Sequence, residues 1–282
     1  MKDKINIKAP AKINLFLRVL KKRKDGYHDI MSGITFINLF DEISIKKSNS
    51  MIIQYSGTFK PFRGFYDDCI IKRTLKLLNL ENKINLEINI KKNIPIQAGL
   101  GSASTNAAAL IKGLDKLNII KINKNNNFYS HLGTDIPVFL YGKNAIVEGV
   151  GEKIFHHEFP KYFFLLVKPE INFSTKKMYK KISKNLHNNI KIIQNNNIIY
   201  KNNHGNDFDN IVIDEHDEIK QLLKYLSNSE QCIFAQMTGS GSCCFAAYKK
   251  PDYANKAQVK LKENFPKLWS FVGENNSINN LK

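Results

Sequence analysis

A glycine-rich turn between an expected strand and an expected helix is the first place where residue types in this chain predict chemistry. Gly99 and Gly101 lie between an alternating apolar segment at 84–90 and apolar residues at helical spacing over 107–117. Three small hydroxyl residues follow the glycines, namely Ser102, Ser104 and Thr105. A helix start presents free N–H groups and partial positive charge, and glycines let the backbone approach an anion closely. The turn therefore indicates phosphate binding, although an ordinary loop with a Ser or Thr helix cap fits the same letters.

Three further segments carry residues at positions where chemistry is possible. Residues 12–19 alternate between apolar and polar, which predicts a strand with Lys12 and Asn14 side by side on one face. Asp135 precedes Ile-Pro and an apolar run, a pattern that on its own favours a helix N-cap over a catalytic carboxylate. A second glycine-rich turn at 237–242 is either a tight β-turn or a backbone surface that a ligand or the first turn approaches.

Length and composition predict a substantial core and restrict the class of partner. Hydrophobic residues make up 43% of the 282 residues, and about 150 residues per domain would give two domains. The formal charge of +18 comes mainly from lysines scattered among Asn and Ile, which indicates a drift in composition more than a basic face for nucleic acid. Between an anionic small molecule and a nucleic acid as the partner, the charge pattern makes nucleic acid the weaker interpretation, and we expect no nucleic acid.

Cysteine and histidine spacing argues against a disulfide framework and against a metal site built by the protein. The four cysteines form no CxxC, and Cys243 and Cys244 are adjacent, so we expect buried, reduced thiols. The seven histidines show no HxxxH spacing. We see neither a signal peptide nor an apolar run long enough to span a bilayer, and we expect a cytoplasmic protein with no membrane partner.

The order of expected strands and helices predicts an α+β protein of two domains. We place an N-terminal domain at 1–158 and a C-terminal domain at 159–282, because the pattern changes there and a new strand begins near 163. The expected elements include strands at 34–39 and 41–46 and one long helix around 210–226. The Asn-rich segment 185–203 has no pattern that supports an assignment.

Several motifs in register resemble the GHMP kinases. In chain order they are PAKINLFL at 10–17 with DGYH at 25–28, PIQAGLGSASTNAAA at 95–109, GTDIPVFL at 133–140, EGVGE at 148–152 and MTGSGSCCFA at 237–246. The resemblance runs from about 9 to about 246 and leaves only the Asn-rich insert unmatched. It implies an N-terminal nucleotide-binding domain like the second domain of ribosomal protein S5 and a C-terminal ferredoxin-like domain, with the substrate between them.

The resemblance also implies a reaction. A GHMP kinase with these motifs would transfer the γ-phosphoryl group of ATP to the tertiary hydroxyl on carbon 2 of a methylerythritol unit carrying a cytidyl diphosphate, in non-mevalonate isoprenoid biosynthesis. The partner would be this small-molecule substrate, and the chain would be a monomer or a homodimer. No metal-binding carboxylate stands out apart from Asp135, so we expect Mg²⁺ to arrive with ATP and to touch Ser102 or Ser104.

Residue roles follow from the resemblance position by position. The catalytic lysine and aspartate of the family fall on Lys12 and Asp135. The ATP-phosphate loop falls on consecutive residues: Pro95, Ile96, Gln97, Ala98, Gly99, Leu100, Gly101, Ser102, Ala103, Ser104 and Thr105. The substrate-binding positions fall on Asn14, Tyr27, His28, Lys92, Thr175 and Tyr179. Among these, Tyr27 and Tyr179 would hold the cytosine between them and His28 would hydrogen-bond it.

These roles make chemical sense. A tertiary alcohol is a crowded and poor nucleophile, so an adjacent carboxylate suits the role of general base. Lys12 would orient Asp135, keep it ionised and face the transferring phosphoryl group. Aromatic rings would hold the faces of the cytosine while His28 reads its polar edge. Together with the resemblance, this chemistry makes catalysis the favoured interpretation of Asp135.

One departure from the family and two alternative functions remain. Ser102 and Ala103 stand where two glycines are expected; both are small enough for an anion to fit, but the loop geometry is expected to differ. One alternative is a GHMP kinase acting on mevalonate or homoserine, for which Tyr27 and His28 have no clear purpose. The other is a non-catalytic, basic nucleic-acid-binding protein on the S5-like fold, against which the presence of Lys12 and Asp135 argues.

Overall fold

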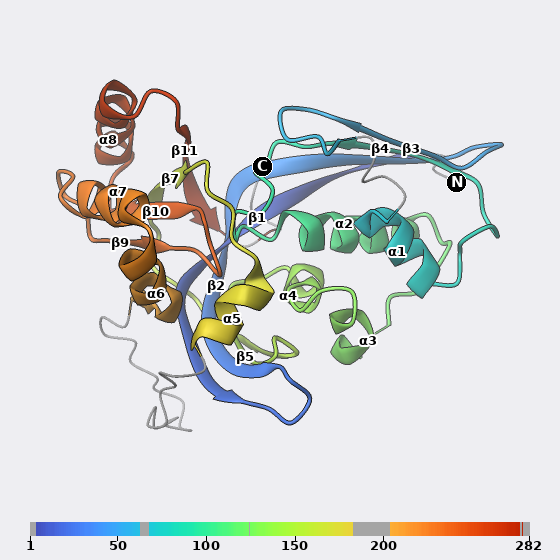
Figure 1. Cartoon of the computed structure of the whole chain (residues 1–282). Helices are drawn as coiled ribbons and strands as arrows, with labels where there is room; N and C mark the ends of the chain where they lie inside the picture. The colour runs from blue at the N-terminus through green and yellow to red at the C-terminus, as the bar shows by residue number, and fades with distance from the viewer. Residues whose placement is uncertain (1–3, 63–67, 124, 183–203, 277, 279–282) are drawn as a thin grey trace.

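A long antiparallel hairpin forms the spine of the protein (Figure 1). Its strands are β1 (Lys4–Lys22) and β2 (His28–Lys47). The computed structural model describes residues 4–62, 68–123, 125–182, 204–276 and 278. The two strands expected at 34–39 and 41–46 are one strand, β2. The pairing register shifts between Pro10 and Ala11, opposite Phe40. The hydrogen-bonded ladder continues through this irregularity, although the sequence pattern there suggests that one strand ends and another begins.

The second strand of the hairpin, β2, joins the two halves of the molecule. It pairs with β4 (Leu86–Lys91), β5 (Ala145–Gly149) and β11 (Trp269–Asn276), as well as with β1. Two short strands extend this part of the sheet, β3 (Ile52–Ser56) beside β4 and β6 (Lys153–His156) beside β5. Because β11 is near the end of the chain, its pairing with β2 ties the last part of the sequence to the first.

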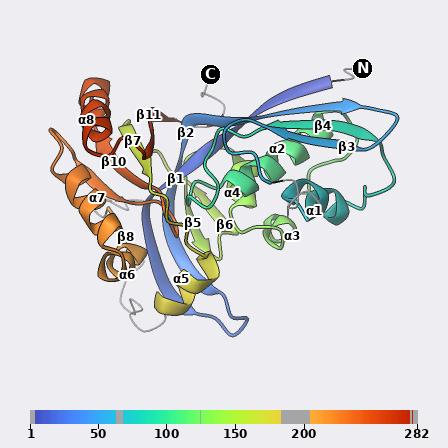
Figure 2. The ribbon, with the colours of Figure 1, turned by 45° about the horizontal axis from the view of Figure 1, so that its top comes forward.

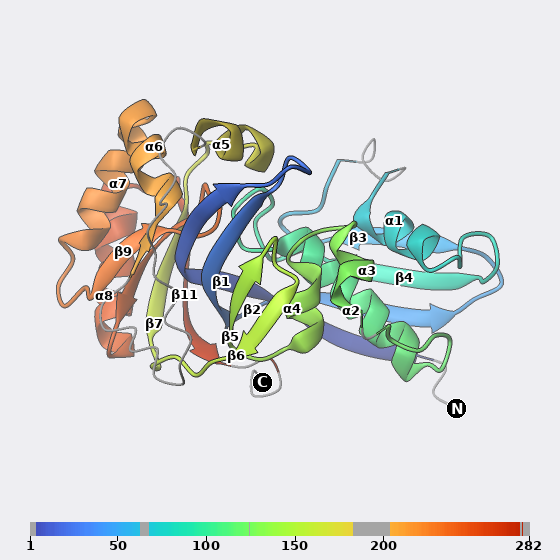
Figure 3. The same ribbon diagram turned by 90° about the horizontal axis from the view of Figure 1, so that it is seen from below.

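In the described part of the N-terminal half, four helices lie on one side of the hairpin and of β4 (Figures 1 and 3). They are α1 (Ile70–Leu77), α2 (Ser102–Lys116), α3 (Asn126–Ser130) and α4 (Ile136–Tyr141). The apolar residues expected at helical spacing face the sheet, and Leu110 and Leu114 pack in one cluster with Ile43 and Ile45 of β2. Burial of this stripe places the start of α2, and the glycine turn before it, at the centre of the molecule.

The C-terminal half is an antiparallel sheet with helices on it (Figure 2). Beyond β11 the strand order is β7 (Phe163–Lys168), β10 (Cys244–Tyr248) and β9 (Phe234–Met237). The other elements are α5 (Thr175–Ile182), β8 (Gly205–Asn206), α6 (Asp207–Glu215), α7 (Asp217–Ser227) and α8 (Pro251–Asn264). The single helix expected around 210–226 is therefore two helices, because His216 adopts an extended conformation with φ −135°.

The domain boundary expected between 158 and 159 falls in the connection from β6 to β7, and it stays a prediction. The Asn-rich segment 185–203 lies outside the described residues. Among the helices that the structure describes, none combines the length and the apolar character needed to cross a bilayer.

Candidate active site

A cavity of about 640 Å³ opens between the two glycine-rich turns. Most of the residues that the sequence predicts as functional line it: Lys12, Asn14, Lys92, Pro95, Ile96, Gln97, Ala98, Gly99, Gly101, Ser102, Ala103, Ser104, Asp135, Thr175 and Tyr179. The predicted residues outside its lining are Leu100 and Thr105, each 1% exposed, and Tyr27 and His28. Residues from β1, the α2 start, the α4 start, α5 and the second turn thus meet around one space.

The first glycine turn needs glycine at two positions. Gly99 and Gly101 have φ +70° and +73°, a region that side chains with a Cβ rarely adopt. A Cβ on Gly99 would lie 1.9 Å from the carbonyl oxygen of Thr238, so the two glycine turns are in direct contact. Gly101 is also the N-cap residue of α2, and no side chain caps that helix. The start of α2 therefore faces the cavity without the Ser or Thr cap that would compete with an anion for its N–H groups.

The replacement of two loop glycines by Ser102 and Ala103 is explained by their place in the fold. Both residues belong to the first turn of α2, where φ is negative, so neither position requires glycine. Ser102 is 8% exposed and its hydroxyl oxygen accepts a hydrogen bond of 2.5 Å from the Lys92 ammonium. The backbone conformation at these two positions therefore gives no reason for the loop geometry to differ from that of a loop with glycines.

Lys12 and Asp135, which are far apart in sequence, meet at the cavity. The Lys12 Nζ lies 3.6 Å from an Asp135 carboxylate oxygen, and the two side chains are 4% and 33% exposed. Asp135 occupies the N-cap position of α4, as the sequence pattern suggests, but its side chain makes no capping hydrogen bond. Its carboxylate is therefore directed to Lys12 and the cavity rather than to the helix.

The neighbours of Lys12 on β1 hold its side chain in place. Its ammonium donates to the side-chain oxygen of Asn14, whose amide nitrogen donates to the Ser32 hydroxyl over 2.8 Å. The backbone N–H of Asn14 donates to the Thr238 hydroxyl over 3.0 Å. Asn14 is 2% exposed and thus connects Lys12, β2 and the second glycine turn.

A buried charged cluster lies beneath the first turn, and its centre, Asp41, is not among the residues that the sequence predicts as functional. The Asp41 carboxylate is 0% exposed and accepts hydrogen bonds from the backbone N–H groups of Asn93 and Ile94, at 2.7 and 2.9 Å. It also forms an ion pair with Lys92 and accepts from the amide of Asn106 over 2.8 Å. Burial lowers the pKa of Lys92, and the charge of Asp41 and its hydrogen bond oppose that effect.

The Lys92 ammonium has three hydrogen-bond partners among the described residues. Its ammonium donates to Asp41, to the Ser102 hydroxyl and, over 2.9 Å, to the Asn106 side-chain oxygen. Lys92 borders the cavity but is only 4% exposed, so its contact with substrate stays a prediction. The sequence contains a signal for Asp41. This residue shares a strand face with Leu39, Ile43 and Ile45, because every second residue of a strand lies on the same face, and a charge among these apolar residues is therefore buried.

The second glycine turn forms the opposite wall of the cavity and is hydrogen-bonded to the first. The backbone N–H groups of Ser242 and Cys243 donate to the carbonyls of Gln97 and Ala98, at 3.4 and 3.3 Å. Thr175, at the start of α5, shares a hydrogen bond of 2.8 Å with the hydroxyl of Ser240. The segment is a tight turn of the β9–β10 hairpin, closed by a hydrogen bond of 3.1 Å from the Gly241 N–H to the Thr238 carbonyl, and it also contacts the first turn.

Tyr27 lies in the turn of the hairpin and His28 begins β2, and this end of the hairpin lies beside α5, the helix that contains Tyr179 (Figure 3). The rings of His28 and Tyr179 stack with centroids 5.3 Å apart and planes at 27°. Tyr27 is 56% exposed, and the buried Nε2 of His28 has no hydrogen-bond partner among the described residues. Burial and the charge of Lys22 lower the pKa of His28, which keeps its ring neutral near neutral pH. The buried Nε2 of His28 thus keeps a hydrogen-bonding capacity that no described residue uses.

The metal-binding capacity of the site is small. No group of three or more His, Cys, Asp or Glu side chains that could hold a metal ion occurs in the described part of the chain. At the cavity, Asp135 is accompanied by the hydroxyl residues Ser102 and Ser104. Mg²⁺ commonly binds through one or two carboxylates and the phosphates of a nucleotide, and these residues fit that requirement.

Comparisons with known proteins agree on one family. The model of the GHMP kinases N-terminal domain matches residues 69–143, and that of the GHMP kinases C-terminal region matches 185–267. The 4-diphosphocytidyl-2-C-methyl-D-erythritol kinase of Francisella tularensis subsp. novicida is 35% identical over 85% of this chain and 88% of its own length. The protein of the same name from Prochlorococcus marinus is 35% identical over 93% of each chain.

Solved structures show the same fold. A crystal structure of 4-(cytidine 5'-diphospho)-2C-methyl-D-erythritol kinase matches with a TM-score of 0.79 at 23% identity, over 97% of this chain and 100% of that one. A homoserine kinase from Cytophaga hutchinsonii matches with a TM-score of 0.60 at 17% identity, over 98% and 96% of the two chains. The chain has the two-domain GHMP kinase fold, and by its sequence it belongs to the family of the 4-diphosphocytidyl-2-C-methyl-D-erythritol kinases.

Proposed function

We propose that this protein transfers the γ-phosphoryl group of ATP to the tertiary C2 hydroxyl of 4-diphosphocytidyl-2-C-methyl-D-erythritol. Membership of the family supports the reaction, and ATP use follows from the GHMP kinase fold. The observation that carries the proposal is the pair Lys12 and Asp135, 3.6 Å apart beside the uncapped start of α2. A carboxylate, an ammonium and free helix N–H groups around one cavity are what phosphoryl transfer to an alcohol requires.

Asp135 acts on the nucleophile in this proposal. It accepts the proton of the C2 hydroxyl as the new oxygen–phosphorus bond forms and the bond to the ADP leaving oxygen breaks. Lys12 holds the carboxylate in its ionised form and places positive charge beside the transferring group. Asn14 fixes the direction of the Lys12 side chain, so the charge is already in position before the substrate binds.

The first glycine turn and α2 hold the phosphates. Gly99 and Gly101 allow the backbone to approach them, and the start of α2 contributes N–H groups and partial positive charge. Mg²⁺ that accompanies ATP neutralises phosphate charge when bound, and Asp135, Ser102 and Ser104 are the residues that would hold it. The Ser102 hydroxyl already accepts from Lys92, which orients its remaining lone pair.

Tyr27, His28 and Tyr179 would bind the cytidyl group. The neutral His28 ring offers Nε2 to the polar edge of the cytosine, and Tyr27 and Tyr179 offer aromatic faces. This end of the site supports the cytidyl substrate over mevalonate or homoserine, which have no ring to stack. Whether the protein is a monomer or a homodimer, and whether it is cytoplasmic, stay predictions.

A coupled assay of ADP release tests this function. We expect turnover with ATP, Mg²⁺ and 4-diphosphocytidyl-2-C-methyl-D-erythritol, and none with mevalonate or homoserine at the same concentrations. Phosphorus NMR of the product should show a phosphomonoester on the methylerythritol unit. Turnover of mevalonate or homoserine in place of the cytidyl substrate would refute the proposal. Salt-sensitive binding of generic nucleic acid by an inactive chain would instead support the nucleic-acid alternative.

A further inference from the structure

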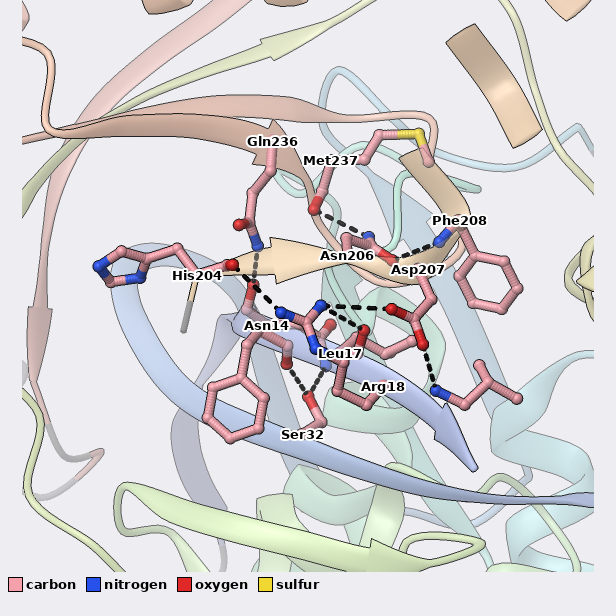
Figure 4. A network of polar contacts seen from close by, with 12 residues as sticks. Asn14, Leu17, Arg18, Ser32, His204, Asn206, Asp207, Phe208, Gln236 and Met237 are labelled. Atoms are coloured by element: carbon pink, nitrogen blue, oxygen red, sulfur yellow. Dashed lines mark hydrogen bonds and ion pairs between the residues drawn. The ribbon is translucent and has the colours of Figure 1, made fainter. Parts of the chain in front are cut away.

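The amide side chain of Asn206 joins the start of α6 to the second glycine turn (Figure 4). Its oxygen accepts a hydrogen bond of 3.0 Å from the backbone N–H of Phe208 and so caps α6. Its nitrogen donates to two carbonyl oxygens, of Met237 at 3.0 Å and of Gly239 at 2.7 Å. Both N–H bonds of the amide are thus used on the turn, and the residue is 5% exposed.

The turn that Asn206 holds is packed against the catalytic lysine. Gly239 has φ +57°, and a Cβ placed on it would lie 3.2 Å from Lys12 Nζ, from Asn14 Oδ1 and from the Gly99 carbonyl oxygen. Thr238, the preceding residue, accepts from the backbone N–H of Asn14. A displacement of this turn would therefore be felt at Lys12, at its orienting partner and at the phosphate loop together.

The segment that contains Asn206 is attached to β1 by strand pairing and by hydrogen bonds. Asn206 belongs to β8, which pairs in parallel with β1 at Phe16 and Leu17. The Asp207 carboxylate next to it accepts from the backbone N–H of Val19 over 2.7 Å and from the Arg18 guanidinium over 3.3 Å (Figure 4). The turn is therefore connected, through Asn206 and Asp207, to β1, the strand that also contains Lys12.

A second carboxylate holds the other side of the turn. Asp209, in the first turn of α6, accepts from the backbone N–H of Met237 over 3.1 Å, while Asn206 takes the Met237 carbonyl. Asn206 does not line the cavity, and its side-chain nitrogen contacts the site only through the turn.

We propose that Asn206 is a positioning residue for phosphoryl transfer: its two N–H bonds hold the second glycine turn against Lys12, separately from its role as the cap of α6. This inference rests on the proposed function and adds a residue to it. It predicts that loss of the two donors slows the chemical step while the binding of the cytidyl group, which the proposed function places at Tyr27, His28 and Tyr179, is unchanged.

The variant Asn206→Asp separates the two roles. Aspartate keeps an oxygen that caps α6, but it loses both donors and turns a negative charge toward two carbonyls. Because a displacement of about 1 Å in a catalytic group costs on the order of 100-fold in rate, we expect kcat to fall by that order. We expect KM for the cytidyl substrate to stay unchanged.

Asn275 provides a matched control elsewhere in the fold. It is also 5% exposed, its oxygen accepts from the backbone N–H of Tyr162 over 2.7 Å, and its nitrogen donates to the Pro160 carbonyl over 3.1 Å. Asn275→Asp therefore loses the same kind of buried donor without touching the turn. We expect a similar fall in melting temperature for both variants and a fall in kcat only for Asn206→Asp.

Hydrogen–deuterium exchange of the peptide 237–242 adds a readout that needs no activity. Faster exchange there in Asn206→Asp, and not in Asn275→Asp, supports the inference; equal exchange in the two variants overturns it. Equal kcat per folded molecule in the two variants, or a rise confined to KM for the cytidyl substrate, also overturns it. An inactive native chain would instead refute the proposed function, and the exchange measurement would still decide about Asn206. If Asn206→Asp fails to fold, Asn206→Ser retains a short cap and removes the donors without added charge.

Discussion

The places where the proposed function puts the phosphates and the cytosine base are built differently. At the phosphate end, Lys12, Asp41 and Lys92 already have protein partners, and the two glycine turns are hydrogen-bonded to each other. At the base end, Tyr27 is 56% exposed and the buried Nε2 of His28 has no partner among the described residues. The difference teaches where preorganisation is needed: charge must be in place for the chemical step, whereas a flat base can complete its own site by stacking and hydrogen bonding.

The largest effect is expected from removing charge at the phosphate end. Asp135→Asn and Lys12→Ala should each lower kcat by on the order of 1,000-fold, because general-base and electrostatic assistance contribute at this scale. Asp135→Asn should leave KM for the cytidyl substrate near the native value, since the proposed function places the cytosine at Tyr27, His28 and Tyr179 and not at Asp135. Steady-state kinetics measure both quantities. A near-native kcat in Asp135→Asn would remove the general-base role.

Breaking the buried pair beneath the first turn should destabilise the fold. Lys92→Met leaves the fully buried Asp41 carboxylate without its cation, and the free energy of unfolding should fall by about 3–5 kcal/mol. Lys91→Met is the matched control next to it: Lys91 pairs with Glu42 over 3.2 Å with both side chains 56% exposed, so about 0–1 kcal/mol is expected. Urea unfolding of the two variants gives the comparison, and equal losses would contradict it.

At the base end, substitutions should act on substrate binding. Tyr27→Ala should raise KM for the cytidyl substrate roughly tenfold, because stacking of a base on an aromatic ring is worth about 1–3 kcal/mol. Its effect on KM for ATP should be negligible. Tyr141→Ala, which removes another exposed tyrosine outside the cavity lining, serves as the control. An effect of Tyr27→Ala confined to ATP would exclude stacking on the cytosine.

The smallest expected effect is a dependence of cytidyl binding on pH. The pKa of His28 lies below the ordinary value of 6.5, because burial and Lys22 disfavour the charged ring. KM for the cytidyl substrate should therefore be constant above pH 6.5 and rise only at lower pH, as protonation removes the acceptor. His28→Phe keeps an aromatic ring beside Tyr179 but cannot titrate, so its KM should be higher and independent of pH in that range. The same low-pH rise in His28→Phe would assign the titration to another group.

Much of the site was predictable because its signals are local. Glycines at 99 and 101 are required by the backbone of a single turn, and the alternation over 12–19 places Lys12 beside Asn14. The sequence led us to expect too large an effect of Ser102 and Ala103 on the loop geometry. The start of α2 cannot be located from the sequence to within two residues, and both residues are inside the helix.

By itself, then, the sequence determined the elements that carry the chemistry and the family whose motifs they resemble. Short-range conformational preferences do not depend on the rest of the fold, and they can therefore be predicted from a few consecutive residues.

Only the tertiary structure decided which side chains meet. Three sets of contacts join distant segments: the ion pair of Lys12 with Asp135, the hydrogen bonds that Asp41 accepts from residues 92–106, and the hydrogen bond from Asn206 to Gly239. Such contacts depend on strand register and helix packing, because a shift of one residue in a strand turns every side chain to the other face. The register of β1 against β2 and β8 thus places Lys12 at the cavity, which no local pattern contains.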